Sequence, residues 1–189
     1  MTLTLDNGTE LVEGCRAGNN AARKELYVRY AKQMLAVCYR YTGDVEAAHD
    51  VLHDGFIKAF THFTYRGECS LKSWLTRVMM TQSIDFLRQR ERFARLVVYE
   101  EQLPDCADEE PVAGSEADSL SQEVLMELLA GLPTGCRTVF NLYVFEEKSH
   151  QEIASLLGIK EHTSTSQLHR AKLLLAKKIK EYIEHENRR

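Results

Sequence analysis

The apolar residues of this chain recur at helical spacing in two long stretches, and one acidic segment between them breaks the pattern. Leu71, Leu75 and Val78 illustrate the spacing of three and four residues. From residue 96 to residue 119 two prolines, one glycine and eight carboxylates replace it. Such a composition buries too little apolar surface to fold alone. We therefore expect an all-α protein with two small helical domains, residues 1–95 and 121–189, joined by an acidic flexible linker over residues 96–120.

Three helices are expected in the first domain, over residues 20–41, 45–63 and 70–95. A glycine-containing turn, residues 42–44, and a polar loop, residues 64–69, separate them. In the second domain, helical periodicity returns at Val124, breaks at Pro133 and resumes at Val139. No alternation typical of β-strands is evident.

The net charge of −4 hides an uneven distribution. Residues 1–95 carry 14 Lys and Arg against 11 Asp and Glu, residues 96–136 carry none against 10, and residues 137–189 carry 10 against 7. Affinity for nucleic acid follows local positive potential more than net charge. Two mildly basic domains therefore fit a protein that binds nucleic acid.

Residues 149–152, Ser-His-Gln-Glu, have the form of a capping box and predict that a helix begins there. Gly158 ends this short helix, and a longer amphipathic helix follows. That order is typical of a helix-turn-helix, whose second helix enters the major groove. A plain helical hairpin that packs on a partner is the alternative. The polar residues near the start of the second helix are candidates for base and phosphate contacts: His162, Thr163, Ser164, Thr165, Ser166, Gln167, His169, Arg170 and Lys172.

Two features of the first domain also suggest contacts. Asp50 and Asp54 lie four residues apart, so one helix face presents both carboxylates, either to a basic partner or simply to solvent. The loop over residues 63–70, with Lys72, Trp74 and Arg77 after it, combines aromatic and cationic groups. Such groups suit an unstacked base and a single-stranded backbone, although Trp74 also fits a core position.

Three stretches, residues 50–60, 71–88 and 132–171, resemble in order and spacing the extracytoplasmic-function (ECF) group of sigma factors, in the sigma-70 family of bacterial RNA polymerase. The resemblance implies a sigma2-type helical bundle that binds core polymerase and recognises the minus-ten element. It implies a sigma4-type helix-turn-helix that reads the minus-thirty-five element. The implied core-polymerase contacts are Asp50, His53, Asp54 and Phe56. The implied minus-ten contacts are Tyr65, Arg66, Glu68, Lys72, Trp74, Arg77, Thr81, Gln82, Asp85, Arg88 and Arg90.

The resemblance further implies an alternative sigma factor that directs promoter-specific initiation and performs no chemistry, with no cofactor. Its implied partners are the clamp and flap regions of core polymerase, promoter DNA and an anti-sigma factor. Three departures from the family pattern are present. In the docking helix, His53 stands where the family usually has Gln. Met80-Thr81 stands where Arg-Asn is common, and Thr165 and Gln167 stand where Lys and Arg are usual, which leaves the promoter bases open.

Three rival readings make different predictions. A helix-turn-helix regulator would bind duplex DNA tightly without polymerase, whereas a helical adaptor would not need its basic residues. A zinc hydrolase would use His49 and His53, which imitate the spacing of an HExxH helix, but a third ligand is not evident.

No leader or membrane-spanning pattern is present, so we expect a cytoplasmic protein without membrane insertion. The five cysteines form no CxxC pair and are expected to be reduced.

Overall fold

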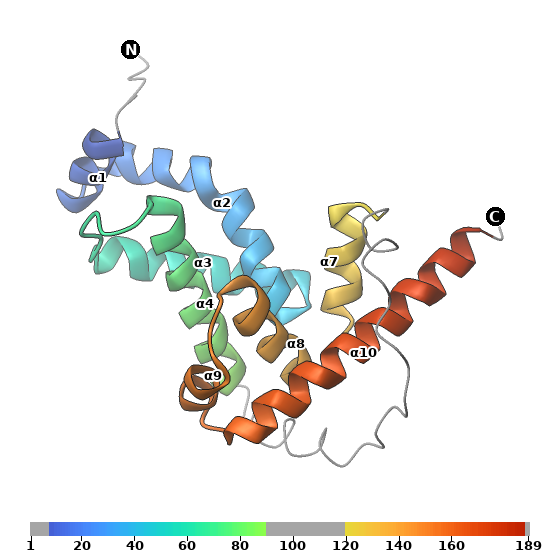
Figure 1. Cartoon of the computed structure of the whole chain (residues 1–189). Helices are drawn as coiled ribbons and strands as arrows, with labels where there is room; N and C mark the ends of the chain where they lie inside the picture. Colours follow the sequence, from blue (N-terminus) through green and yellow to red (C-terminus); the bar gives the residue numbers. More distant parts are fainter. Residues whose placement is uncertain (1–7, 90–119, 188–189) are drawn as a thin grey trace. The chain divides into compact units, whose positions relative to one another are not determined.

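The computed structural model describes residues 8–89 and 120–187, and all the elements in these ranges are helices (Figure 1). This confirms the predicted all-α class. The described residues form two compact units. The N-terminal unit holds residues 8–39 and 45–86, and the C-terminal unit holds residues 40–44, 87–89 and 120–187. Arg90 and residues 96–119 of the predicted linker lie outside the described residues.

Four helices build the N-terminal unit: α1 (Gly8–Arg16), α2 (Asn20–Thr42), α3 (Val45–Thr61) and α4 (Leu71–Gln89). The last residues of α2, from Arg40, and of α4, from Leu87, belong to the C-terminal unit. The bounds of α2 and α3 agree with the predicted helices to within two residues. Helix α1 was not predicted. Asn19 begins α2, because its side-chain oxygen accepts the amide of Ala21 at 2.8 Å.

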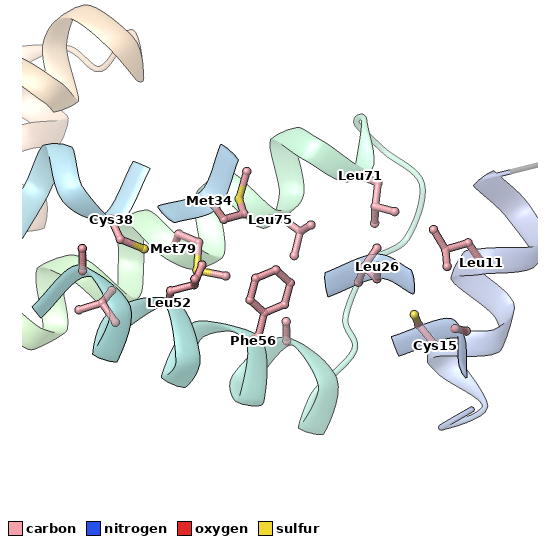
Figure 2. Packing of buried hydrophobic residues seen from close by; sticks show 14 residues of the cluster. Leu11, Cys15, Leu26, Met34, Cys38, Leu52, Phe56, Leu71, Leu75 and Met79 are labelled. Carbon is pink, nitrogen blue, oxygen red and sulfur yellow. The ribbon is translucent and has the colours of Figure 1, made fainter. Parts of the chain in front are cut away.

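The core of the N-terminal unit lies where α2, α3 and α4 meet. Figure 2 shows their labelled side chains pointing toward one another, with the ring of Phe56 among them. At Gly55 a Cβ atom would collide with the Sδ atom of Met79, so glycine permits the close approach of α3 to α4. Leu11 and Cys15 extend the same cluster into α1. The first helix is thus held by apolar burial.

The C-terminal unit contains α7 (Gln122–Ala130), α8 (Thr134–Phe140), the π-helix η1 (Asn141–Phe145), α9 (His150–Leu157) and α10 (Glu161–Glu186). Pro133 separates α7 from α8, as its position predicted. Leu129, Leu132, Cys136 and Ala171 form a buried cluster, against which Phe140 and two leucines of α10 pack. Helix α10 therefore joins the elements of this unit through one apolar face.

The predicted helix-turn-helix is present in α9 and α10. The Ser149 hydroxyl accepts the amide of Glu152 at 3.2 Å, and the Glu152 carboxylate accepts the amide of Ser149 at 2.8 Å. This confirms the capping box. Gly158 ends α9 in the left-handed conformation, with φ +70°, which costs glycine little and other residues more. The turn between the two helices depends on both features.

The capping box predicts a pH dependence. Hydrogen bonds from the Ser149 amide and hydroxyl lower the pKa of Glu152 below its ordinary value of 4.5. A lowered pKa stabilises the folded state above the unfolded value, and this stabilisation is lost as pH falls through the folded value. We expect wild-type stability to decline more steeply below pH 4.5 than that of Glu152→Gln, which keeps an acceptor but does not ionise. Urea unfolding between pH 3 and pH 6 measures this, and parallel curves for the two proteins would contradict it.

Three cysteines, Cys15, Cys38 and Cys136, are buried, and Cys69 is half-buried. Burial raises the pKa of the Cys38 thiol to about 12 and also raises the pKa of Cys15, so both thiols stay protonated at neutral pH. Cys106 lies outside the described residues.

Within the described ranges, no helix has the length and apolar character needed to cross a membrane.

Candidate nucleic-acid interface

Helix α3 separates a buried face from an exposed acidic one. Asp50, His53 and Asp54 are all exposed, and Ile57, half of whose surface is accessible, continues the same face one turn later. The spacing of three, four and seven residues places them together. We call Asp50, His53, Asp54 and Ile57 the docking face. Sequence reasoning missed Ile57, although its spacing from Asp50 was available.

Phe56 was predicted to bind polymerase, and the structure places its side chain in the interior. It is 3% exposed, and its ring lies 4.8 Å from that of Tyr27 and 5.6 Å from that of Phe60. A side chain with this burial is part of the folded core. Phe56 therefore supports the docking face from beneath. The partner contacts of the four predicted residues stay predictions.

An aromatic cluster organises the loop between α3 and α4. The ring of Phe63 lies 5.1 Å from that of Trp74, and the ring of Tyr65 lies 5.7 Å from it. The Tyr65 hydroxyl donates to the carbonyl of Cys69 at 2.7 Å, which closes the loop on itself. Trp74 is half-buried within this cluster, so it both packs and borders the surface. Arg66 and Glu68 are exposed at the tip, next to Gly67 with φ +83°.

Helix α4 places some of the predicted minus-ten residues on its surface and ties others to α3. Lys72, Arg77, Thr81 and Arg88 are exposed. The Lys58 ammonium lies 3.6 Å from the Asp85 carboxylate and donates to the Gln82 side chain at 3.5 Å. Asp85 and Gln82 thus have a partner within the unit. Arg77 and Thr81, four residues apart, are exposed on one side of α4.

Helix α10 divides the nine predicted minus-thirty-five residues between its surface and the interior. An exposed stripe, which we call the reading face, contains His162, Thr165, Ser166, His169 and Lys172. Arg170 is half-buried. The reading face has the spacing of one helical side, so five side chains can meet one groove.

Thr163, Ser164 and Gln167, which were also predicted as groove contacts, are buried, and their contacts with DNA stay predictions. The Gln167 side-chain oxygen accepts a hydrogen bond from the Cys136 thiol at 2.8 Å, and Gln167 is 2% exposed. Ser164 Oγ lies 2.9 Å from His150 Nδ1 of α9, within hydrogen-bonding distance. Buried polar groups need such partners. Ser164 and Gln167 thus bond α10 to α9 and α8, and the stripe beside them is exposed.

The described residues do not support a metal site on α3. His49 and His53 are both exposed, and no group of three or more His, Cys, Asp or Glu side chains lies close enough to hold a metal ion in residues 8–89 and 120–187. A protein zinc site needs at least three such ligands.

A cavity of about 400 Å³ lies in the N-terminal unit, where α1, α2 and the loop after α3 meet. Arg16, Arg29 and Arg66 line it together with the aromatic side chains of Tyr30 and Tyr65. The Arg16 guanidinium donates to the carbonyl of Tyr65 at 3.0 Å, so α1 is bonded to the loop. Sequence reasoning missed this cavity because α1 was not predicted.

Two family models match the chain. The model described as "Sigma-70 region 2" matches residues 26–93, and that described as "Sigma-70, region 4" matches residues 122–175. The chain is 28% identical to RNA polymerase sigma factor YlaC of Bacillus subtilis strain 168, over 86% of this chain and 95% of that protein. It is 24% identical to ECF RNA polymerase sigma factor SigW of the same organism, over 90% of this chain and 95% of that protein. The chain also matches a solved structure, that of the sigma factor RpoE in complex with the anti-sigma factor NepR from Bartonella quintana. The sequence identity is 18% and the TM-score is 0.48, and the match covers 83% of this chain and 96% of the chain in that structure.

Proposed function

The chain belongs to the sigma-70 family of RNA polymerase sigma factors, in its ECF group, and from this premise we propose how its exposed faces divide the tasks of such a factor. It is an alternative sigma factor that binds core RNA polymerase and directs promoter-specific transcription initiation. The docking face contacts the polymerase clamp. The loop after α3 and the surface of α4 bind the minus-ten strand. The reading face of α10 contacts the minus-thirty-five element, while its unit binds the flap.

One observation carries this assignment. The region 2 match lies mainly on the N-terminal unit and the region 4 match lies on the C-terminal unit, so the two regions follow each other in numerical order along the chain. Each matched range contains one of the exposed faces described above. The docking face carries two carboxylates, which suits a basic protein surface. The loop and α4 carry aromatic and cationic groups, which suit a single strand. The reading face carries short polar side chains on a helix that follows a glycine turn, which suits a groove.

The reading face also favours this function over that of an independent repressor. It contains one lysine, Lys172, with two histidines and two hydroxyl side chains, and the neighbouring Arg170 is half-buried. Neutralisation of phosphates by Lys and Arg supplies much of duplex affinity. A face with so few fixed cations binds duplex weakly by itself. It becomes effective when polymerase contacts hold it on the promoter.

The proposal also covers the location, the lack of catalysis and a third partner of this protein. The protein acts in the cytoplasm, where RNA polymerase works. It catalyses no reaction itself, and the chemistry belongs to the polymerase. An anti-sigma factor is its third partner, expected to compete with core polymerase for exposed faces such as the docking face. Co-purification of the full chain from its source cell identifies that partner.

A run-off transcription assay with core polymerase and genomic fragments tests the function. We expect discrete transcripts only when the protein is added, and duplex binding by the protein alone no tighter than about 10⁻⁶ M at physiological salt. Tight, sequence-specific duplex binding without polymerase, together with an absence of transcripts, would instead identify an independent regulator.

The same assay tests the reading face. The double variant Thr165→Ala/His169→Ala is expected to reduce transcription from the strongest promoter by about tenfold or more, because each lost base contact costs about 1–3 kcal/mol. Binding to core polymerase should not change. The matched control is Lys180→Ala/Glu184→Ala, which removes two exposed side chains from α10 beyond the region 4 match. Equal transcription from both double variants would exclude the reading face from promoter recognition.

A further inference from the structure

Lys58 of α3 contacts two residues of α4 that were predicted to bind the minus-ten strand. Its ammonium lies 3.6 Å from the Asp85 carboxylate and donates to Oε1 of Gln82 at 3.5 Å. Gln82 and Asp85 are three residues apart, so one side of α4 presents both to Lys58. Lys58 was not among the predicted contacts, although it lies within the region 2 match. It is therefore a neighbour of the proposed strand-binding surface that the sequence did not indicate.

The contact with Lys58 determines which end of the Gln82 side-chain amide is engaged. An ammonium group has three donors and no acceptor, so it bonds only to the amide oxygen. The amide nitrogen, Nε2, carries two donor hydrogens. In residues 8–89 and 120–187, no group accepts a hydrogen bond from Nε2 of Gln82. Because Gln82 is only half-buried, this donor end is the one that it offers to a ligand.

Asp85 favours the position of Lys58 in which this contact forms. The Lys58 side chain is half exposed, and a lysine stem takes many rotamers in solution. The Asp85 carboxylate attracts the ammonium toward α4, where the Gln82 oxygen also accepts from it. An exposed ion pair of this kind contributes little to stability. We therefore expect Lys58 to affect the orientation of one side chain more than the folding of the unit.

The orientation of the amide matters because the bases differ in their exocyclic groups. G and T carry a keto oxygen that accepts a hydrogen bond, whereas A and C carry an amino group that donates one. An amide that presents its nitrogen pairs with a keto base, and one that presents its oxygen pairs with an amino base. An amide that is free to turn over accepts both classes.

We propose that Lys58 is a positioning residue that holds the Gln82 amide with its nitrogen toward DNA, so that Gln82 selects a keto base, G or T, at one position of the minus-ten non-template strand. The proposal rests on the sigma-factor function above and adds to it a class of base and the residue that determines it. Lys58 acts through Gln82. Without its ammonium the amide turns over, and the amino bases A and C are rejected less well.

The experiment uses holoenzyme formed from the full chain and core polymerase, on the promoter found by run-off transcription. Each base of the minus-ten non-template strand is replaced by the other three, and transcription gives the ratio of keto-base to amino-base templates at each position. Gln82→Ala identifies the position at which Gln82 acts, because the ratio should fall there alone. Lys58→Met, which has a similar stem but no donor, is expected to lower the same ratio about fivefold. Lys58→Arg, which keeps a charged donor, is expected to restore most of it.

The matched control is Lys24→Met, which makes the same change at an exposed cation of α2 and should keep every wild-type ratio. If wild-type protein gives transcripts but Lys58→Met keeps every ratio, the positioning role is wrong while the function stands. The same holds if Lys58→Met lowers transcription equally from all templates, since that is a general loss of binding or folding. A preference for A or C at the Gln82 position, or no change of any ratio in Gln82→Ala, also contradicts the proposal. If wild-type protein gives no transcripts, the function itself fails.

Discussion

Replacement of Asp50 and Asp54 together by lysine is expected to weaken binding to core RNA polymerase by about 100-fold or more. Both carboxylates are exposed on the docking face of α3, beside the half-exposed Ile57. The two lysines would face a polymerase surface that we propose to be basic. Like charges in an interface cost several kcal/mol, and a loss of about 2.7 kcal/mol in binding free energy corresponds to a 100-fold weaker affinity. Promoter-specific transcription should fall in parallel. Titration of labelled core polymerase measures the affinity.

Salt dependence and a matched variant make this test specific. Affinity of the wild type should fall as salt rises, because exposed charges are screened, and the reversed variant should lack this dependence. The control Glu181→Lys/Glu184→Lys makes the same change in net charge at two exposed carboxylates of α10. Wild-type affinity in the Asp50/Asp54 variant, or equal weakening in the control, would remove the docking face from the proposal.

Replacement of Arg137 by alanine is expected to lower the free energy of unfolding of the C-terminal unit by about 3–5 kcal/mol. Arg137 is 5% exposed, and its guanidinium donates to four backbone carbonyls. Nη1 reaches Ala130 at 2.6 Å and Leu132 at 2.9 Å, Nε reaches Tyr41 at 3.1 Å, and Nη2 reaches Thr42 at 2.9 Å. Alanine leaves these carbonyls without their donor, and each buried one costs about 1–3 kcal/mol.

Urea unfolding followed by two signals measures the loss. Trp74 is the only tryptophan of the chain and belongs to the N-terminal unit, so its fluorescence follows that unit. Circular dichroism follows the helices of both. We expect the fluorescence transition to stay near its wild-type midpoint while part of the dichroism signal is lost at lower urea. Arg137→Lys, with three donors on a flexible stem, should give an intermediate loss. An unchanged dichroism transition in Arg137→Ala would contradict the structural role.

The sequence predicted most helices correctly because their local signals agree with their packing. The capping box at Ser149, the glycine turn at Gly158 and the break at Pro133 each act within a few residues, and all three are present. Helix α1 was missed because its burial depends on Leu11 and Cys15 reaching a cluster formed by the other helices. The π-helix η1 was missed as well, since its residues continue the helical pattern of α8.

The candidate contacts were less predictable, because polarity along a helix does not determine exposure. Gln167 is buried and accepts a hydrogen bond from a thiol 31 residues away, and Ser164 is buried within hydrogen-bonding distance of His150 of the preceding helix. Neither partner follows from spacing within α10. Phe56 was assigned to polymerase binding because a resemblance of sequence identifies a segment but not the side of the helix on which each residue lies.

The separation of buried and exposed polar residues on α10 has a consequence for how such a protein diversifies. The interior set, Thr163, Ser164 and Gln167, is buried, and Ser164 and Gln167 contact α9 and α8, while the five residues of the reading face are exposed. Substitutions can accumulate on the reading face at little cost to folding. A library of variants at those five positions alone is expected to keep the scaffold folded.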